Sequence, residues 1–163
     1  MALERRFKLA RPLSKVEDKE VRLYYNNLVL YYVIKINYVA FMAKARKQSD
    51  EFGDSWKPLA PKTIKEKRKR KFLYGGVVLI NIRTRALMNA VRPGKFKNGE
   101  YIPSEGQYVE VTEKSITFGI DVEYAGSVNS KRRVIVPMES LLPAAKLAAE
   151  PQFAVYLRRR GLL

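Results

Sequence analysis

The sequence predicts an α+β fold, in which a long N-terminal helix and shorter helices pack on a small antiparallel sheet, with a long loop or hairpin insertion and extended termini. Three observations predict this fold class. Apolar residues recur every three or four positions from about residue 16 to residue 48, which is typical of a helix. Apolar and polar residues alternate between Tyr108 and Ile120, which is typical of an antiparallel hairpin. From Leu141 to Leu157 the spacing becomes helical again.

The length of 163 residues suits one domain, which is long enough to bury a single core. We assign this α+β domain to residues 16–157, with a flexible loop insertion at 92–107. Residues 1–15 show no sustained periodicity and are expected to form an N-terminal arm that orders against a neighbouring molecule. Residues 158–163 form a basic and apolar C-terminal tail, which we expect to dock on another subunit.

The first predicted helix begins near Val16 and ends near Gln48, after basic residues that suit the helix dipole. Its apolar stripe consists of Val21, Tyr25, Leu28, Tyr32, Ile36, Val39 and Ala43. Additional apolar residues widen this surface, so we expect the helix to be covered on more than one side, with a partner subunit as one source of cover. The aromatic and β-branched content also permits a strand in places.

A basic segment follows. The turn at residues 49–60 carries the only tryptophan, Trp56, and Pro61 fits the first position of a second helix. Between Lys62 and Lys71 there are seven basic residues and one acidic residue, Glu66. Since such a helix can bury little, we expect it either to be solvated or to face nucleic acid or an acidic partner, and the sequence favours neither.

The middle of the chain is less regular. Residues 73–82 are apolar and carry a glycine pair that favours a turn or bulge, and Thr84 can cap a short helix. Glycine and proline residues between 92 and 107 predict the loop or hairpin insertion, which in our preferred interpretation reaches a neighbouring molecule.

The second half of the chain contains the expected sheet. The candidate strands are Tyr108–Thr112, Ser115–Ile120, Val122–Val128 and Val134–Val136. The first two are expected to pair across a turn at Glu113 and Lys114. The C-terminal helical residues are expected to form one or two segments broken near Pro151.

Composition excludes several classes of function. The chain has no cysteine and no histidine, which removes thiolate nucleophiles, disulfides, imidazole bases and the zinc sites built on those ligands. No signal peptide is recognisable, so we expect the protein to be made and kept in a cytoplasm. The most apolar run, Leu28 to Ile34, has 7 residues, whereas roughly 20 are needed to span a bilayer. Membrane insertion is therefore not expected.

The strongest compositional feature is the charge. There are 32 lysine and arginine residues against 16 aspartate and glutamate residues, which gives a formal net charge of +16. Nucleic acid is one candidate partner, because basic side chains release counterions from the phosphate backbone whatever the base sequence. An acidic protein partner or a solvated surface is an equally weighted alternative. No groove-reading motif is present, so any DNA contact is expected to be independent of base sequence.

Residues suited to catalysis are few. Glu66 and the pair Asp121 and Glu123 supply acidic groups of the type that a metal-dependent nuclease needs, but short acidic strings are common by chance. Neither a Gly-x-x-x-x-Gly-Lys-Ser/Thr string nor a Gly-x-Gly-x-x-Gly string is present. Trp56 and nearby aromatic residues can stack on bases, although burial of the indole in the fold is favoured. We predict no enzymatic activity, no metal site and no cofactor.

The order of the segments along the chain is similar to that of a known protein family. A long helix leads to Phe52-Gly53-Asp54-Ser55-Trp56-Lys57-Pro58-Leu59, and then to Thr63 and Lys67 on the basic helix. Leu79-Ile80-Asn81, a helix start at Thr84, the hairpin and Val122-Glu123-Tyr124-Ala125 follow. Over roughly residues 20 to 145 this order resembles the tailed-phage virion morphogenesis (tail-completion) family, whose members carry Trp-x-Pro-Leu, Thr-x-x-x-Lys, Thr-Gly-x-Leu and a hairpin ending in Tyr-Ala. Arg85 stands in place of the family's usual glycine.

The resemblance implies a structural virion protein of a tailed bacteriophage, a ring-forming neck or tail-completion (tail terminator-like) subunit that joins the tail to the head connector. It implies a homo-oligomeric ring, either a hexamer or a dodecamer. The implied partners are neighbouring neck, connector and tail-tube proteins, with sequence-nonspecific contact to packaged DNA left open. The implied location is the neck or tail of the virion, after assembly in the host cytoplasm. The alternative is a sequence-nonspecific nucleic-acid-binding protein.

Three groups of residues are candidates for function. The subunit-interface candidates are Phe7, Leu9, Tyr24, Tyr31, Phe41, Phe96, Tyr101, Leu162 and Leu163. The residues expected to anchor the turn before the basic helix are Trp56, Pro58 and Leu59. The basic candidates for a surface that faces DNA or a partner are Lys65, Lys67, Arg68, Lys69, Arg70, Lys131, Arg132 and Arg133.

Overall fold

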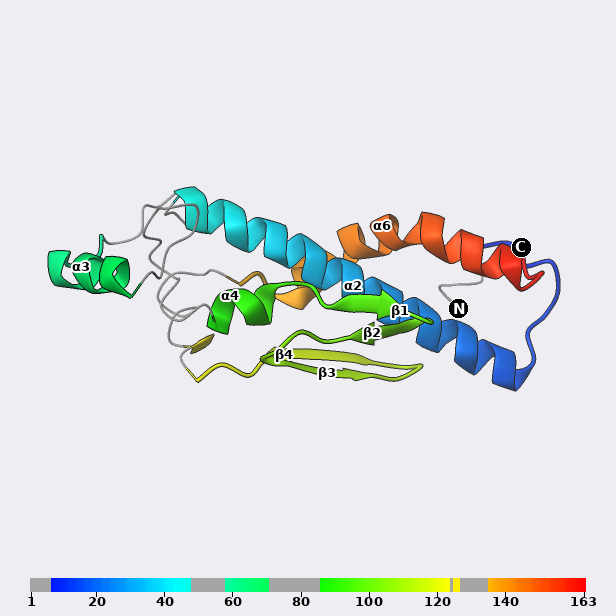
Figure 1. The fold of residues 1–163 in the computed structure, drawn as a ribbon. Helices are drawn as coiled ribbons and strands as arrows, with labels where there is room; N and C mark the ends of the chain where they lie inside the picture. The colour runs from blue at the N-terminus through cyan, green and yellow to red at the C-terminus, as the bar shows by residue number, and fades with distance from the viewer. Residues whose placement is uncertain (1–6, 48–57, 71–85, 124, 127–134) are drawn as a thin grey trace.

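The computed structural model describes residues 7–47, 58–70, 86–123, 125–126 and 135–163. In chain order the described elements are α2 (Lys15–Lys47), α3 (Pro61–Lys69), α4 (Ala86–Val91), β1 (Lys95–Lys97), β2 (Glu100–Ile102), β3 (Gln107–Val111), β4 (Ile116–Ile120) and α6 (Met138–Arg159). The strands form two antiparallel pairs, β1 with β2 and β3 with β4. The predicted α+β class is confirmed. Figure 1 shows α2 as the central element, with α6 along one side and the hairpins along the other.

The helix α2 begins with a capping box that the pattern Ser-x-x-Glu encodes at Ser14. The backbone N–H of Glu17 donates to Ser14 Oγ at 3.2 Å, and the backbone N–H of Ser14 donates to Glu17 Oε2 at 3.0 Å. The guanidinium of Arg11 donates to both oxygens of the same carboxylate, at 2.6 and 3.0 Å. The first turn of α2 is therefore held by side chains that are close in the sequence.

The helix α2 buries different faces along its length. Its N-terminal half packs Val21 and Leu28 against α6, and its C-terminal half packs Phe41 against α4. The single apolar stripe predicted from the sequence therefore holds only for the first half, and Val39 is 63% exposed. The face that is buried changes because the element that covers it changes from α6 to α4.

By length and composition, α2 is the one helix in the described part of the chain that is able to cross a membrane. However, 56% of its most apolar window is buried inside the chain, and the core helix of a soluble protein passes the same test. That no membrane is entered stays a prediction.

The C-terminal helix α6 runs without interruption through Pro143 and Pro151, so the predicted break near Pro151 is wrong. A proline inside a helix removes one backbone hydrogen bond and crowds the preceding turn. Phe153 and Leu157, which follow Pro151, are buried against α2. We attribute the continuity of α6 to this packing, which outweighs the local preference for a break.

The two long helices are antiparallel, and side-chain pairs fix their register. The rings of Tyr24 and Tyr156 stack with centroids 3.7 Å apart. Nearer the chain ends, the guanidinium of Arg160 donates to Glu20 at 2.7 Å. The start of α2 thus lies against the end of α6, as Figure 1 shows.

The C-terminal tail docks on its own chain, which corrects the expectation that it docks on another subunit. Gly161 has a φ of +64° and closes α6 with a Schellman motif, in which the N–H of Leu162 donates to the carbonyl of Leu157 at 2.9 Å. Leu162 is fully buried, and its carbonyl accepts the N–H of Ala10 at 3.0 Å. The described part of the predicted N-terminal arm is therefore also ordered by the chain itself.

Asparagines of α2 attach the hairpins. The N–H of Tyr101 on β2 donates to Asn27 Oδ1 at 3.0 Å, and Asn26 Nδ2 donates to the carbonyl of Thr112, beyond β3, at 2.7 Å. Of the two forms predicted for the insertion at 92–107, a loop or a hairpin, the structure has the hairpin, in which β1 and β2 pair and pack on α2. The predicted hairpin across Glu113 and Lys114 is confirmed, with Val111 paired to Ile116.

The remaining local predictions have mixed outcomes. Val122 and Glu123, at the start of the predicted strand 122–128, are not in a strand, and neither are Ile135 and Val136. Asn37 instead holds Val136 through two hydrogen bonds to its backbone, at 3.1 and 3.3 Å. The helix start at Thr84 and the glycine pair at 75–76 lie outside the described residues.

Candidate interaction surfaces

Three of the nine subunit-interface candidates lie in the core of the single chain. Phe41, Tyr101 and Leu162 are at most 5% exposed. These residues are not available to a neighbouring subunit, so their assignment to an interface is wrong. Leu163 is 38% exposed and remains a candidate.

The other five aromatic and aliphatic candidates are half-buried, and all of them contact the same chain. They are Phe7, Leu9, Tyr24, Tyr31 and Phe96. Phe7 meets Phe153 edge-on at 5.1 Å, and Phe96 meets Tyr24 edge-on at 5.5 Å. Intramolecular packing thus accounts for most of the residues predicted to form subunit interfaces.

Tyr101 joins the two hairpins through its hydroxyl group. The hydroxyl oxygen accepts the N–H of Gly94 at 2.8 Å, and the hydroxyl donates to Gln107 Oε1 at 2.7 Å. Burial raises the pKa of Tyr101, because the phenolate form is the harder one to desolvate. The ring is therefore a neutral structural link between the β1–β2 hairpin and the start of β3.

An apolar surface does remain uncovered, on the outer side of α6. It consists of Ala144, Leu147, Ala148, Pro151 and Val155, which we call the outer stripe. Leu147 is 62% exposed and Val155 is 42% exposed. The spacing of three and four residues places all five on one side of the helix, away from the buried Ala149 and Phe153. The helical spacing of apolar residues from Leu141 to Leu157 does not by itself separate this stripe from the buried side of α6.

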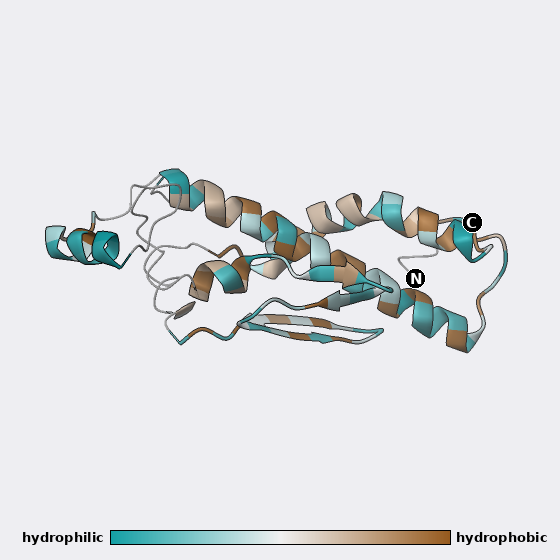
Figure 2. Cartoon of the chain, in the orientation of Figure 1, coloured by the Kyte–Doolittle hydropathy of each residue, from teal (hydrophilic) through white to brown (hydrophobic). Residues whose placement is uncertain are grey.

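The basic helix α3 separates its residues into two groups. Lys62, Lys65, Arg68 and Lys69 are exposed, and within the described residues none of them forms an ion pair; we call them the cationic arc. Lys67 is only 5% exposed, so its assignment to the partner-facing surface is wrong. Figure 2 colours α3 as mostly hydrophilic, and Figure 1 shows it set apart from the packed helices and hairpins.

The other four basic candidates differ in outcome. Arg70 is exposed, but it donates to Glu66 at 2.9 Å across one turn, which neutralises part of its charge. Lys131, Arg132 and Arg133 lie outside the described residues.

The proposed turn before α3 is described only in part. Trp56 lies outside the described residues, Pro58 is exposed and Leu59 is half-buried. Pro61 occupies the first position of α3, as predicted.

Exposed acidic residues lie on and beside the β3–β4 hairpin. Glu105, Glu110, Asp121 and Glu123 are exposed, and none of them pairs with a lysine or arginine among the described residues. Across the described ranges, no three acidic side chains lie close enough together to hold a metal ion. Asp121 and Glu123, the residues of the nuclease hypothesis, thus belong to an open charged surface.

Comparison of the chain with protein-family models, with curated proteins and with solved structures gives no match.

Proposed function

We propose that the chain is a structural subunit of a tailed-phage neck or tail, which assembles with copies of itself into a ring that joins the tail to the head connector. The resemblance of its sequence to the virion morphogenesis family supports this function and implies six or twelve copies. The outer stripe of α6 is the structural observation that carries the proposal. An apolar helix face that the chain leaves exposed is the kind of surface that subunit contacts bury.

The position of the outer stripe suits a contact between copies. The opposite side of α6 packs against α2 of the same chain, so the outer stripe is the side of α6 that remains available to a second copy. Burial of a fully exposed side chain of this kind contributes about 1.5–3 kcal/mol, and Leu147 and Val155, which are 62% and 42% exposed, contribute a corresponding part of it. The stripe is therefore large enough to contribute to an interface, and a closed ring gives every copy the same contact.

Particle size tests this function. Wild-type protein is expected to form ring-sized particles in sedimentation velocity and negative-stain images at low ionic strength. Leu147→Glu places a charge in the stripe and is expected to give smaller species. The matched control is Val39→Glu, because Val39 is equally exposed and lies on α2 outside the stripe.

Two results would contradict the proposal. One is a wild-type protein that stays a single chain at every concentration tested. The other is a Leu147→Glu variant that still forms rings as well as the Val39→Glu variant does. Imaging of virions with an antibody against the chain then tests the location, which is expected at the junction of head and tail.

The cationic arc of α3 favours a second candidate function, sequence-nonspecific nucleic-acid binding. An exposed cluster of lysine and arginine on a helix is a common contact for phosphate backbones. This function predicts binding to a DNA duplex of arbitrary sequence that weakens steeply as salt is added.

A further inference from the structure

The charge of the chain is unevenly distributed. Residues 98–130 hold six of the 16 acidic residues but only one of the 32 basic residues. The remainder of the chain is correspondingly more basic than the net charge of +16 suggests. The protein thus carries an acidic region around the β3–β4 hairpin and basic regions elsewhere.

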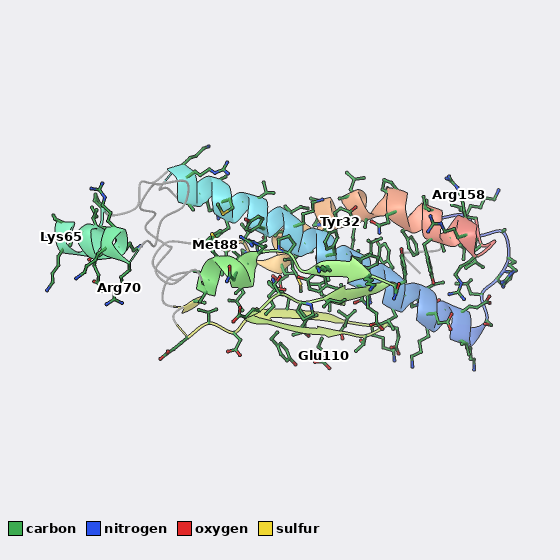
Figure 3. All side chains as sticks on the ribbon, viewed as in Figure 1. Tyr32, Lys65, Arg70, Met88, Glu110 and Arg158 are labelled. Carbon is green, nitrogen blue, oxygen red and sulfur yellow. The ribbon has the colours of Figure 1, made fainter. Side chains whose placement is uncertain are left out.

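The acidic region is built by the hairpin itself. The acidic hairpin surface consists of Glu105, Glu110, Asp121 and Glu123. The N–H of Asp121 donates to the carbonyl of Gly106 at 2.8 Å, which keeps the exit from β4 beside the loop that carries Glu105. Figure 3 shows Glu110 on the side of the hairpin that faces away from α2.

The basic helix α3 presents a complementary surface. Lys62, Lys65 and Lys69 are spaced three and four residues apart and so lie on one side of the helix. The half-buried Thr63 and Ile64 and the buried Lys67 lie on the other side. Figure 3 shows Lys65 and Arg70 on α3 at one end of the molecule, at a distance from the hairpin that carries Glu110.

We propose that the cationic arc of α3 in one copy docks on the acidic hairpin surface of the next copy. This inference rests on the proposed ring and identifies one of its contacts. Within the described residues, neither surface is neutralised by the chain's own side chains. Docking in the ring neutralises both surfaces at once.

The geometry of a ring fits this pairing. In a head-to-tail ring each copy contributes two different surfaces, one to each neighbour. A two-fold dimer through either surface would instead place like charges together, which opposes association. Charge complementarity between two different surfaces of one chain therefore opposes a dimer through either surface alone and is compatible with a head-to-tail ring.

Contact of α3 with DNA accounts for less of what is observed. A phosphate backbone would neutralise the cationic arc but would leave the acidic hairpin surface without a partner. Docking on the acidic hairpin surface of a second copy neutralises both the cationic arc and the acidic hairpin surface. Binding of α3 to DNA is one of the outcomes that the test distinguishes.

The test uses charge reversal on each surface. Variant A carries Lys62→Glu, Lys65→Glu and Lys69→Glu, and variant B carries Glu110→Lys, Asp121→Lys and Glu123→Lys. The matched control for variant A is Lys8→Glu, Lys15→Glu and Lys19→Glu, which makes the same change in net charge at exposed positions of the N-terminal segment and the start of α2. Circular dichroism checks that each variant is folded.

Sedimentation velocity at low ionic strength gives the readout. Variants A and B alone are each expected to need a roughly tenfold or higher protein concentration to form rings, because like charges meet at every contact. An equimolar mixture of A and B is expected to restore rings, since opposite charges then meet across the contacts. The control variant is expected to assemble as wild type does.

The outcomes separate this inference from the proposed function. If wild type forms rings and variant A still forms them as readily as the control, the inference fails while the ring proposal stands. If wild type never forms rings, both fail. If variant A assembles normally but loses its affinity for a random-sequence DNA duplex in fluorescence anisotropy, α3 faces DNA and the inference is overturned. Failure of the A and B mixture to assemble, with both variants folded, also overturns it.

Discussion

Tyr101 shows how one side chain can connect two hairpins. Its ring is buried, and its hydroxyl both accepts the N–H of Gly94 and donates to Gln107. Gly94 allows this close packing, because a Cβ at that position would lie 1.9 Å from the carbonyl oxygen of Ile102. The sequence gives no local signal for this arrangement, since the three residues are brought together by the pairing of strands.

We predict that Tyr101→Phe lowers the free energy of unfolding by about 1–2 kcal/mol, because the N–H of Gly94 loses its acceptor in a partly buried place. Urea denaturation measures the change. Tyr108→Phe is the matched control, because Tyr108 is 55% exposed and its hydroxyl makes only a 3.3 Å hydrogen bond to Glu110. An equal effect of both substitutions would contradict a specific role for the buried hydroxyl.

Glu17 makes the stability of the protein depend on pH. The guanidinium of Arg11 and the backbone and hydroxyl of Ser14 lower the pKa of Glu17 from its ordinary value of 4.5 to about 2. Because the folded pKa lies below the unfolded one, the stabilisation is complete above about pH 4.5 and is lost as the pH falls towards 2.

We therefore predict that Glu17→Gln melts at a lower temperature than wild type at pH 6, and that the difference disappears near pH 2. Thermal melts followed by circular dichroism across this range provide the measurement. Glu100→Gln serves as the control, since Glu100 is exposed, lies on β2 and caps no helix. A difference between Glu17→Gln and wild type that is constant with pH would rule out this account.

At the scale of elements, α6 shows packing that overrides a local preference. Pro151 lies in the helix interior with its ring exposed, and the buried Phe153 follows it two residues later. The sequence predicts a break here because proline lacks the N–H that the helix would use. The structure shows a continuous helix because α2 covers the buried side of α6 on both sides of the proline.

We predict that Pro151→Ala raises the free energy of unfolding by up to about 3 kcal/mol, since alanine restores the missing N–H and removes the crowding of the preceding turn. The control is Pro103→Ala, because Pro103 is exposed and lies outside any helix or strand. Chemical denaturation of both variants compares the two effects. A Pro151→Ala variant no more stable than Pro103→Ala would mean that α6 accommodates its proline at no cost.

The elements that were predicted well depend on local patterns. The β3–β4 hairpin follows from alternation of residues around Glu113 and Lys114, and the start of α3 follows from Pro61. The capping box at Ser14 and the Schellman motif at Gly161 also have sequence signals, which are the pattern Ser-x-x-Glu and a glycine directly after the last helical turn. The break in α6 was predicted wrongly because tertiary packing, which has no local signal, decides it.

At the scale of the whole molecule, α2 carries three different contacts on one helix. Its N-terminal half meets α6, its middle meets the hairpins through Leu30 and Ile34, and its C-terminal half meets α4. This arrangement covers most of the apolar residues that we had assigned to subunit contacts. What remains for an assembly is the outer stripe of α6, the cationic arc of α3 and the acidic hairpin surface.

The amino-acid sequence by itself determined the fold class, the long helix, the central hairpin and the basic character of α3, because these depend on periodicity and composition along a short stretch of chain. Only the tertiary structure decided which apolar residues are exposed. Phe41 and Leu147 are both large and apolar, yet Phe41 is buried in a cluster with residues of α4 and Leu147 is 62% exposed. The physical reason is that burial depends on which elements meet in space, and the meeting of α2 with α6 and α4 joins residues that are far apart in the sequence.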